Sequence, residues 1–114
     1  MKLIRCVVPP CHVDEVVDAL KALGDIHGLT VTGGGGWHER QPPRRTVYRG
    51  CEYEVRLQPE MLIDVTAPDY AVDDVVHVVV DRCSIGYTGD DARILVMPVE
   101  DWQEIRARQQ RRTA

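Results

Sequence analysis

The segment YRGCEY at residues 48–53 groups side chains that could take part in chemistry or recognition. It places two phenolic hydroxyls, a guanidinium, a thiol and a carboxylate side by side, just after the basic, proline-containing run QPPRR at 41–45. A tyrosine hydroxyl can accept a covalent group, and aromatic and arginine side chains are common anchors of protein–protein contacts. These residues therefore predict a contact segment with Tyr48 and Tyr53 as its aromatic anchors.

A second group of residues is suited to binding an anion. Gly89 and Asp90 precede an apolar segment, and a glycine in such a turn lets successive backbone N–H groups point at one anion. Arg93 follows them, and Arg106 and Arg108 lie in a basic tail. Their guanidinium groups offer forked donors that match phosphate oxygens. A solvated basic face without a ligand is the alternative interpretation of the tail arginines.

Residues for catalysis or for a structural metal form no familiar pattern. The sequence has no Ser-His-Asp set, no H-E-x-x-H and no Walker-type loop. Its four cysteines have no C-x-x-C spacing, so reduced, scattered thiols are the simpler interpretation. They are Cys6, Cys11, Cys51 and Cys83. The sequence therefore predicts no catalytic residue and no firm metal site.

Composition limits the class of protein further. The chain has 114 residues, 44% of them apolar and 28% charged, which is typical of one globular domain over 1–114. A formal charge of −4 argues against nucleic acid as a partner. No apolar run is long enough to cross a membrane, and the start MKLIRCVVPP is too short for a signal peptide. We therefore expect a cytoplasmic protein without direct membrane insertion.

The first half of the chain predicts a strand, a helix and a strand. Residues 2–9 are a short apolar run closed by two prolines, which indicates a buried strand. Residues 12–24 carry Val and Leu at helical spacing and end at a glycine, which predicts an amphipathic helix. Residues 28–32 predict a strand that runs into the glycines at 33–36. Those glycines permit positive φ angles and let another backbone or a ligand come close.

The second half predicts a loop, a strand, a helix and a strand. Residues 37–52 are polar, and residues 53–66 alternate as a strand with a bulge expected near Gln58-Pro59. Residues 69–83 are rich in valine, which leaves a strand open, but a start at Pro68-Asp69 and the 3.6-residue period favour a helix. Residues 93–99 predict the last strand, and 100–114 an acidic and then basic tail.

The resulting order, βαββαβ, is that of the α+β, ferredoxin-like fold. Proteins of many functions share this fold, so it does not identify one. The unusual feature is a loop of about 16 residues between the second and third strands, because hairpin connections usually span two to five residues. Loops of that length are usually functional or disordered.

The segment at 48–53 resembles the Tyr-Arg-Gly-Ala-Glu-Tyr segment of the PII signalling proteins, the nitrogen regulatory proteins. The likeness extends over almost the whole chain: the start MKLI, the helix VDEVVDALKALG, the strand GLTVT, the position of the long loop, and Gly89-Asp90 before the last strand. The chain is therefore identified as a member of the PII superfamily. The resemblance implies a homotrimer in which segment 37–56 is the T-loop, the arm that contacts a regulated transporter or enzyme.

The resemblance also implies an adenine nucleotide, ATP, ADP or AMP, between neighbouring subunits, with Mg²⁺ as a candidate companion. The residues that it assigns to the nucleotide are Val7, Thr30, Gly35, Gly36, Arg40, Asp64, Gly89, Asp90, Arg93, Arg106 and Arg108. Tyr53 corresponds to the tyrosine that some members carry as a nucleotidylation site, and packing at the start of a strand is its alternative role. Gln41 matches the metal-coordinating glutamine of members that sense 2-oxoglutarate.

Two departures from the family pattern bear on the choice of ligand. The phosphate loop of the family reads Gly-Asp-Gly-Lys, whereas this chain has GDDAR at 89–93, one residue longer and with the extra carboxylate of Asp91. Glu60 stands where 2-oxoglutarate-sensing members have a lysine. A carboxylate there repels a dicarboxylate ligand, so this exchange argues against 2-oxoglutarate.

Three classes of function follow. The first is an allosteric signalling protein that reads adenine nucleotides and acts on a partner through segment 37–56. The second is a divergent sensor of another small anion, such as bicarbonate, linked to carbon acquisition, with ADP or AMP as co-ligand. The third is an enzyme on the same scaffold, which is disfavoured because the sequence has no nucleophile–base pair.

Overall fold

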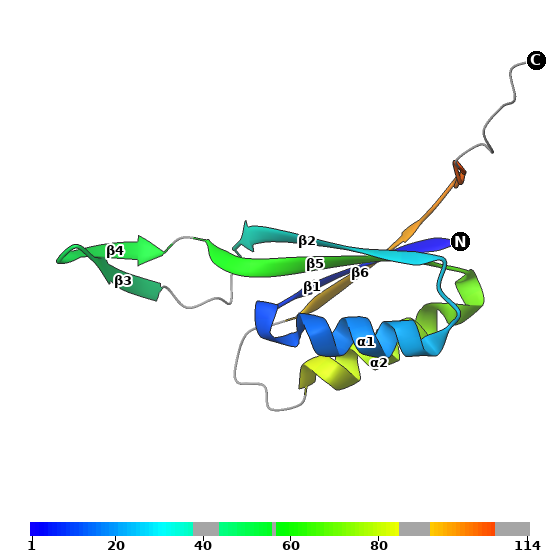
Figure 1. Ribbon diagram of the computed structural model, residues 1–114, viewed down its shortest axis with the longest axis horizontal. Coiled ribbons are helices and arrows are strands. Elements are labelled where there is room, and N and C mark those ends of the chain that lie inside the picture. Colours follow the sequence, from blue (N-terminus) through cyan, green and yellow to red (C-terminus); the bar gives the residue numbers. More distant parts are fainter. Residues whose placement is uncertain (38–43, 56, 85–91, 107–114) are drawn as a thin grey trace, which may run out of the picture.

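The computed structural model describes residues 1–37, 44–55, 57–84 and 92–106. Its main body is a four-stranded antiparallel sheet with two helices on one face (Figure 1). The strands are β1 (Lys2–Val8), β2 (Gly28–Gly36), β5 (Gln58–Ala67) and β6 (Arg93–Pro98), in the spatial order β2-β5-β1-β6. The helices are α1 (Val13–Leu23) and α2 (Val72–Ser84), preceded by the 3-10 turns η1 (Pro10–His12) and η2 (Asp69–Ala71). This arrangement confirms the predicted α+β, ferredoxin-like fold.

The core lies between the sheet and the helices. Alternate residues of the two central strands are fully or almost fully buried, namely Ile4, Cys6 and Val8 in β1 and Ile63, Val65 and Ala67 in β5. They pack against Val16 and Leu20 of α1 and Val75 and Val79 of α2. Because successive side chains of a strand point to opposite faces, the residues between them lie on the face that no helix covers.

Both predicted helices are present. α1 ends at Gly24, whose φ of 78° is a left-handed value that favours glycine as a helix stop. α2 forms despite its valines because Val75, Val79 and Cys83, spaced four residues apart, are all buried on one side. None of the helices in the described part of the chain is both long and apolar enough to cross a membrane.

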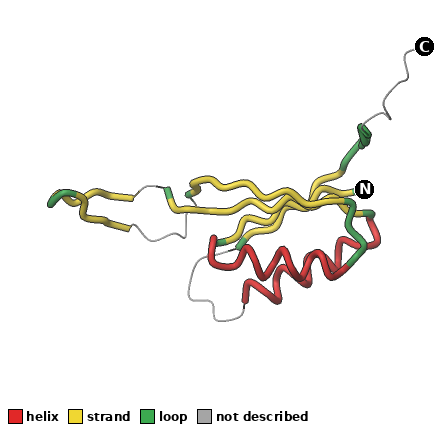
Figure 2. The backbone as a smooth tube through the Cα atoms, viewed as in Figure 1, coloured by secondary structure: helices red, strands yellow, loops and turns green. Residues whose placement is uncertain are grey.

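Residues 44–55 form a β-hairpin that the sequence analysis missed. β3 (Arg44–Tyr48) pairs antiparallel with β4 (Cys51–Val55), and the pair projects from one end of the main sheet (Figure 2). Arg49 and Gly50 connect them with φ angles of 52° and 76°, the positive values that a tight two-residue hairpin turn requires. The prediction of a strandless loop over 37–52 is therefore wrong for 44–48 and 51–52.

The prediction of one continuous strand over 53–66 is also wrong. β4 and β5 belong to different sheets, and the chain passes from one to the other between Val55 and Gln58. The expected bulge near Gln58-Pro59 is absent, since both residues pair in register with Gly36 and Gly35 of β2. The alternation of polar and apolar residues continues across this junction, so it does not reveal that the chain changes sheet.

The glycines at 33–36 extend β2 instead of forming a turn. Gly24 and Gly50 are the glycines with positive φ among the described residues, so the glycines at 33–36 do not use the positive φ that they permit. Close approach favours glycine at positions 35 and 36 of this run. A Cβ at Gly36 would collide with the carboxylate of Glu60, and one at Gly35 would lie 3.2 Å from Cβ of Leu57.

Candidate functional site

The open face of the sheet, the face away from the helices, holds most of the predicted binding residues that the structure describes. Thr30 lies opposite Asp64 in the β2–β5 register, and Val7 lies opposite Arg93 in the β1–β6 register. All four alternate with residues that face the helical layer, so they share the open face. Sheet pairing thus brings together residues from four separate strands.

An ion pair occupies the centre of this face. Nε and Nη2 of Arg5 donate to the two carboxylate oxygens of Asp64 at 2.8 and 3.0 Å, and the two residues are direct partners in the β1–β5 register. Hydrogen bonding to Asp64 and its negative charge raise the pKa of Arg5 further above its ordinary value. Asp64, predicted to contact the nucleotide, therefore has an intramolecular cation as its partner.

A second ion pair lies at the end of the open face where the hairpin begins. Nη2 of Arg93 donates to both carboxylate oxygens of Glu60, at 3.1 and 3.2 Å. The pair is partly buried, because 18% of the Glu60 side chain and 37% of the Arg93 side chain are exposed. The Glu60 carboxylate also lies directly against Gly36. We call this group of three residues the Glu60 corner.

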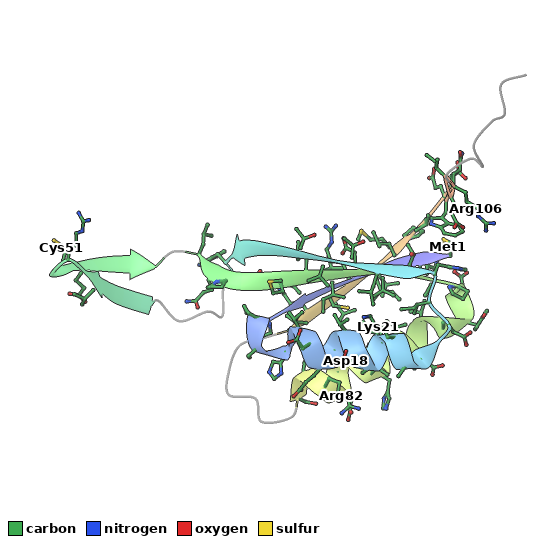
Figure 3. All side chains as sticks on the ribbon, in the orientation of Figure 1. Met1, Asp18, Lys21, Cys51, Arg82 and Arg106 are labelled. Atoms are coloured by element: carbon green, nitrogen blue, oxygen red, sulfur yellow. The ribbon has the colours of Figure 1, made fainter. Side chains whose placement is uncertain are left out.

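The tail arginine Arg106 is not near the Glu60 corner. It lies at the far end of the molecule, close to Met1, whereas Cys51 marks the tip of the hairpin at the other end (Figure 3). The tail leaves the sheet beside β1, where Val99 N–H donates to the carbonyl of Met1. Arg106 is largely exposed, and its Nε forms an ion pair with Glu104 at 3.5 Å. One chain alone does not bring Arg93 and Arg106 together.

The remaining predicted residues fall partly outside the described structure. Arg40, Gln41, Gly89, Asp90 and Arg108 lie outside the described residues. The backbone of Tyr53 is part of β4, which agrees with its predicted place in a strand and does not test its modification. Gly35 pairs with Pro59 of β5.

Sequence reasoning missed the roles of Arg5 and of the Glu60–Arg93 contact. Glu60 was singled out only as a reversed charge, and its partner lies 33 residues away in sequence. The one available signal was the alternation of strand residues, which places Arg5, Glu60, Asp64 and Arg93 on the same face once the strand order is known. The order itself is not visible in the sequence.

Side chains for a metal are not gathered anywhere in the described structure: no group of three or more His, Cys, Asp or Glu residues there could hold an ion. An open depression of about 440 Å³ lies on the helical layer, lined by Glu15, Asp18, Ala19, Ala22 and Arg82. Figure 3 shows Asp18 and Arg82 on the helices, away from the open face. None of the predicted binding residues lines it.

The cysteines differ in burial and in acidity. Cys6 and Cys83 are buried, whereas Cys11 and Cys51 are exposed, and all four are free. Burial, reinforced by the neighbouring Cys83 and Asp64, raises the pKa of the Cys6 thiol to about 12. Burial also raises the pKa of Cys83, with smaller contributions from Cys11 and Glu15. The two buried thiols are therefore protonated and inert at neutral pH.

Comparison with known proteins places this chain in one family. The family model described as "Nitrogen regulatory protein P-II" matches residues 1–109. The chain belongs to the P-II family. It is 37% identical over 106 residues to the nitrogen regulatory protein P-II of Azospirillum brasilense, covering 93% of this chain and 92% of that protein. It is 38% identical over 90 residues to nitrogen regulatory protein GlnK of Escherichia coli K12, covering 79% of each.

Membership of the P-II family confirms the resemblance and defines the general class of function. A third relative, the nitrogen regulatory protein P-II of Haemophilus influenzae, is 34% identical over 100 residues. These relatives are named as regulatory proteins. This P-II protein is accordingly a signalling protein and not an enzyme.

The contrast between the thiols gives a direct test of the core. We expect a disulfide reagent such as DTNB at pH 8 to modify two thiols rapidly in the native protein, because only Cys11 and Cys51 are exposed. Cys6 and Cys83 should react only after denaturation. The control is a variant with Cys11→Ser and Cys51→Ser, which should show no rapid phase. Rapid modification of that variant would show that β1 or the end of α2 is open to solvent.

Proposed function

We propose that this protein binds an adenine nucleotide between the subunits of a cytoplasmic homotrimer and regulates a partner protein through segment 37–56. The nucleotide is ATP, ADP or AMP, with Mg²⁺ as a companion where the phosphates require one. The partner is a transporter or an enzyme. This proposal refines the general role as a signalling protein that family membership establishes.

The observation that carries the proposal is the separation of the predicted phosphate donors. Arg93 lies beside the base of the hairpin, and Arg106 lies at the opposite end of the sheet (Figure 3). Guanidinium groups so far apart in one chain serve one ligand only if two chains contribute to the site. A site between subunits uses the hairpin end of one sheet and the tail end of the next.

The open face supports assembly for a separate reason. Between its two ion pairs it is apolar, with Leu62 and Val7 between the Glu60–Arg93 and Arg5–Asp64 pairs. Leu95 lies opposite Arg5 on β6 and is 47% exposed. An antiparallel sheet can leave one face in water, but apolar residues on that face are better covered by another subunit.

The hairpin supports the proposed contact with a partner. Its two strands pair with each other alone among the described strands, so the main sheet does not require them. Val47 is 71% exposed on it, and the exposed Arg49 forms its turn. An apolar side chain beside arginine on a projecting two-stranded arm is a surface suited to docking.

A second candidate function is the sensing of another small anion, such as bicarbonate, with ADP or AMP as co-ligand. The Glu60 corner disfavours 2-oxoglutarate more than bicarbonate. The carboxylate of Glu60, which Arg93 binds, repels a dianion more strongly than a monoanion. Titration calorimetry with ATP, ADP, AMP, 2-oxoglutarate and bicarbonate separates the two functions. Binding of bicarbonate but of no triphosphate favours the second.

The trimer is tested with one substitution on the open face. We expect Leu95→Asp to convert a trimer to monomers in light scattering at micromolar concentration, because it places a charge among apolar contacts. Val80→Asp is the matched control, since Val80 of α2 is 54% exposed on the helical layer. It should leave the trimer intact. A monomeric unsubstituted protein, or a trimeric Leu95→Asp variant, would contradict the proposed assembly.

The nucleotide site is tested through thermal stability. A ligand that binds only the folded protein stabilises it by about 2.7 kcal/mol at a hundredfold excess over its dissociation constant, so ADP should raise the melting temperature. Arg106→Ala should remove most of that increase and leave the ligand-free melting temperature unchanged, because Arg106 is 83% exposed. Arg82→Ala, an exposed arginine of α2, is the control and should keep the full response. An unchanged ADP response in Arg106→Ala would show that the tail is not part of the nucleotide site.

The contact segment is tested by shortening it at a point that the sheet defines. Gly36 pairs with Gln58, so Trp37 and Leu57 can be joined by Asn-Gly, a sequence that favours a two-residue hairpin turn. Replacing residues 38–56 in this way should preserve the trimer, and because it also removes Arg40, a residue assigned to the nucleotide, ADP should bind about tenfold more weakly, a change of about 1.4 kcal/mol. Proteins captured from a lysate by the full chain should be lost. Capture of the same proteins by the shortened chain would place the contact elsewhere.

A further inference from the structure

We infer that Glu60 is an internal anion that occupies Arg93 and must be displaced before a ligand phosphate can use that arginine. The inference rests on the proposed function for the identity of the ligand, and it adds a residue that sets the ligand's affinity. In this role Glu60 competes with the ligand for Arg93 and does not bind the ligand itself. Binding at this corner becomes an exchange of one anion for another.

The geometry of the corner supports this exchange. One nitrogen of Arg93, Nη2, holds both oxygens of Glu60 at 3.1 and 3.2 Å. Within the residues that the structure describes, Nε and Nη1 of Arg93 donate to no acceptor. The guanidinium therefore has donors left for a phosphate, but the carboxylate beside them repels it. An arriving phosphate gains its full set of hydrogen bonds only when Glu60 moves away.

Gly36 leaves room for the Glu60 carboxylate in this position. The carboxylate packs so closely on Gly36 that any Cβ there would collide with it. Beside it the open face continues with Leu62, the next residue of β5 on that face, and with Val7, which is 7% exposed. The carboxylate thus lies in a partly closed corner and not on a freely solvated surface. A Gln side chain of the same shape can fill this corner without the charge.

The Glu60–Arg93 pair also links β5 to β6 across the end of β1, which lies between them. Glu60 is near the start of β5, two residues after the partner of Gly36, and Arg93 is the first residue of β6. Between these strands lies β1, which ends at Val8, so the ion pair spans the end of β1. The base of the hairpin, at Trp37 and Leu57, is three residues or fewer from the corner in sequence. Because Trp37 directly follows Gly36, against which the Glu60 carboxylate lies, we expect release of Glu60 to change the surroundings of Trp37.

The affinity test uses one charge removal and one matched control. We expect Glu60→Gln to bind ADP and inorganic pyrophosphate about tenfold more tightly in calorimetry, a change of about 1.4 kcal/mol. Glu15→Gln removes the same charge from the exposed face of α1 and should bind within twofold of the unsubstituted protein. Adding Arg93→Met to Glu60→Gln should cancel the gain, because no guanidinium remains to be released.

A second measurement needs no ligand. Trp37 is 66% exposed and directly follows Gly36, and in a Trp102→Phe background it is the single tryptophan of the chain. We expect Glu60→Gln to shift the Trp37 emission, and pyrophosphate to shift the emission of the Glu60-containing protein in the same direction. Glu15→Gln should leave it unchanged.

The outcomes separate this inference from the proposed function. If ADP binds the unsubstituted and Glu60→Gln proteins equally, nucleotide binding stands and the inference is wrong. If neither protein binds ATP, ADP or AMP, the proposed function is wrong, and pyrophosphate and Trp37 still decide the inference. It then holds only if pyrophosphate binds Glu60→Gln more tightly and both Trp37 shifts occur. Absence of either result overturns it.

Discussion

A four-stranded sheet with helices on one side only is the constraint on which the rest of this structure depends. Alternation along β1 and β5 sends Ile4, Cys6, Ile63 and Val65 into the helical layer, and it sends the intervening residues to the other face. Among the described residues, no helix covers that second face. It is therefore the face of the sheet on which a second subunit or a ligand can pack.

The charged residues of the open face form ion pairs, so they do not prevent a second subunit or a ligand from packing on this face. Arg5 with Asp64 and Arg93 with Glu60 each neutralise one another, and apolar residues separate the two pairs. Ion pairs that remain partly exposed contribute little net stability, about 0.2–1 kcal/mol. Arg5 and Asp64 are 41% and 27% exposed, and Arg93 and Glu60 are 37% and 18% exposed, so both pairs are nearer to this class than to fully buried pairs. A pair held so weakly can exchange one partner for a ligand group.

The sequence predicted those parts of the fold that depend on local periodicity. The helical periodicity that includes Val75, Val79 and Cys83 predicted α2 despite its valine content. The apolar run at 2–9 predicted β1. Periodicity could not show that β4 and β5 belong to different sheets, because a strand alternates in the same way in either. The hairpin turn at Arg49-Gly50 was also missed, since an arginine with positive φ is not predictable from its type.

The candidate site was predicted as a set of residues but not as a set of contacts. Strand pairing between β2, β5, β1 and β6 decides which of those residues meet, and pairing depends on tertiary packing. The glycines illustrate the difference. The sequence indicated that something approaches them closely, and the structure identifies it at Gly36 as the side chain of Glu60 from the neighbouring strand.

The same contact accounts for the charge at position 60 without reference to a ligand. A carboxylate in this corner needs a cation within reach and a neighbour small enough to admit it, and Arg93 and Gly36 supply one each. A lysine at position 60 would instead face the guanidinium of Arg93, and two cations in a partly closed corner repel each other. The glutamate, the arginine and the glycine therefore form one interdependent unit. Changing any one of them alone leaves either an uncompensated charge or a steric collision, so the departure at position 60 is explained by residues on two other strands.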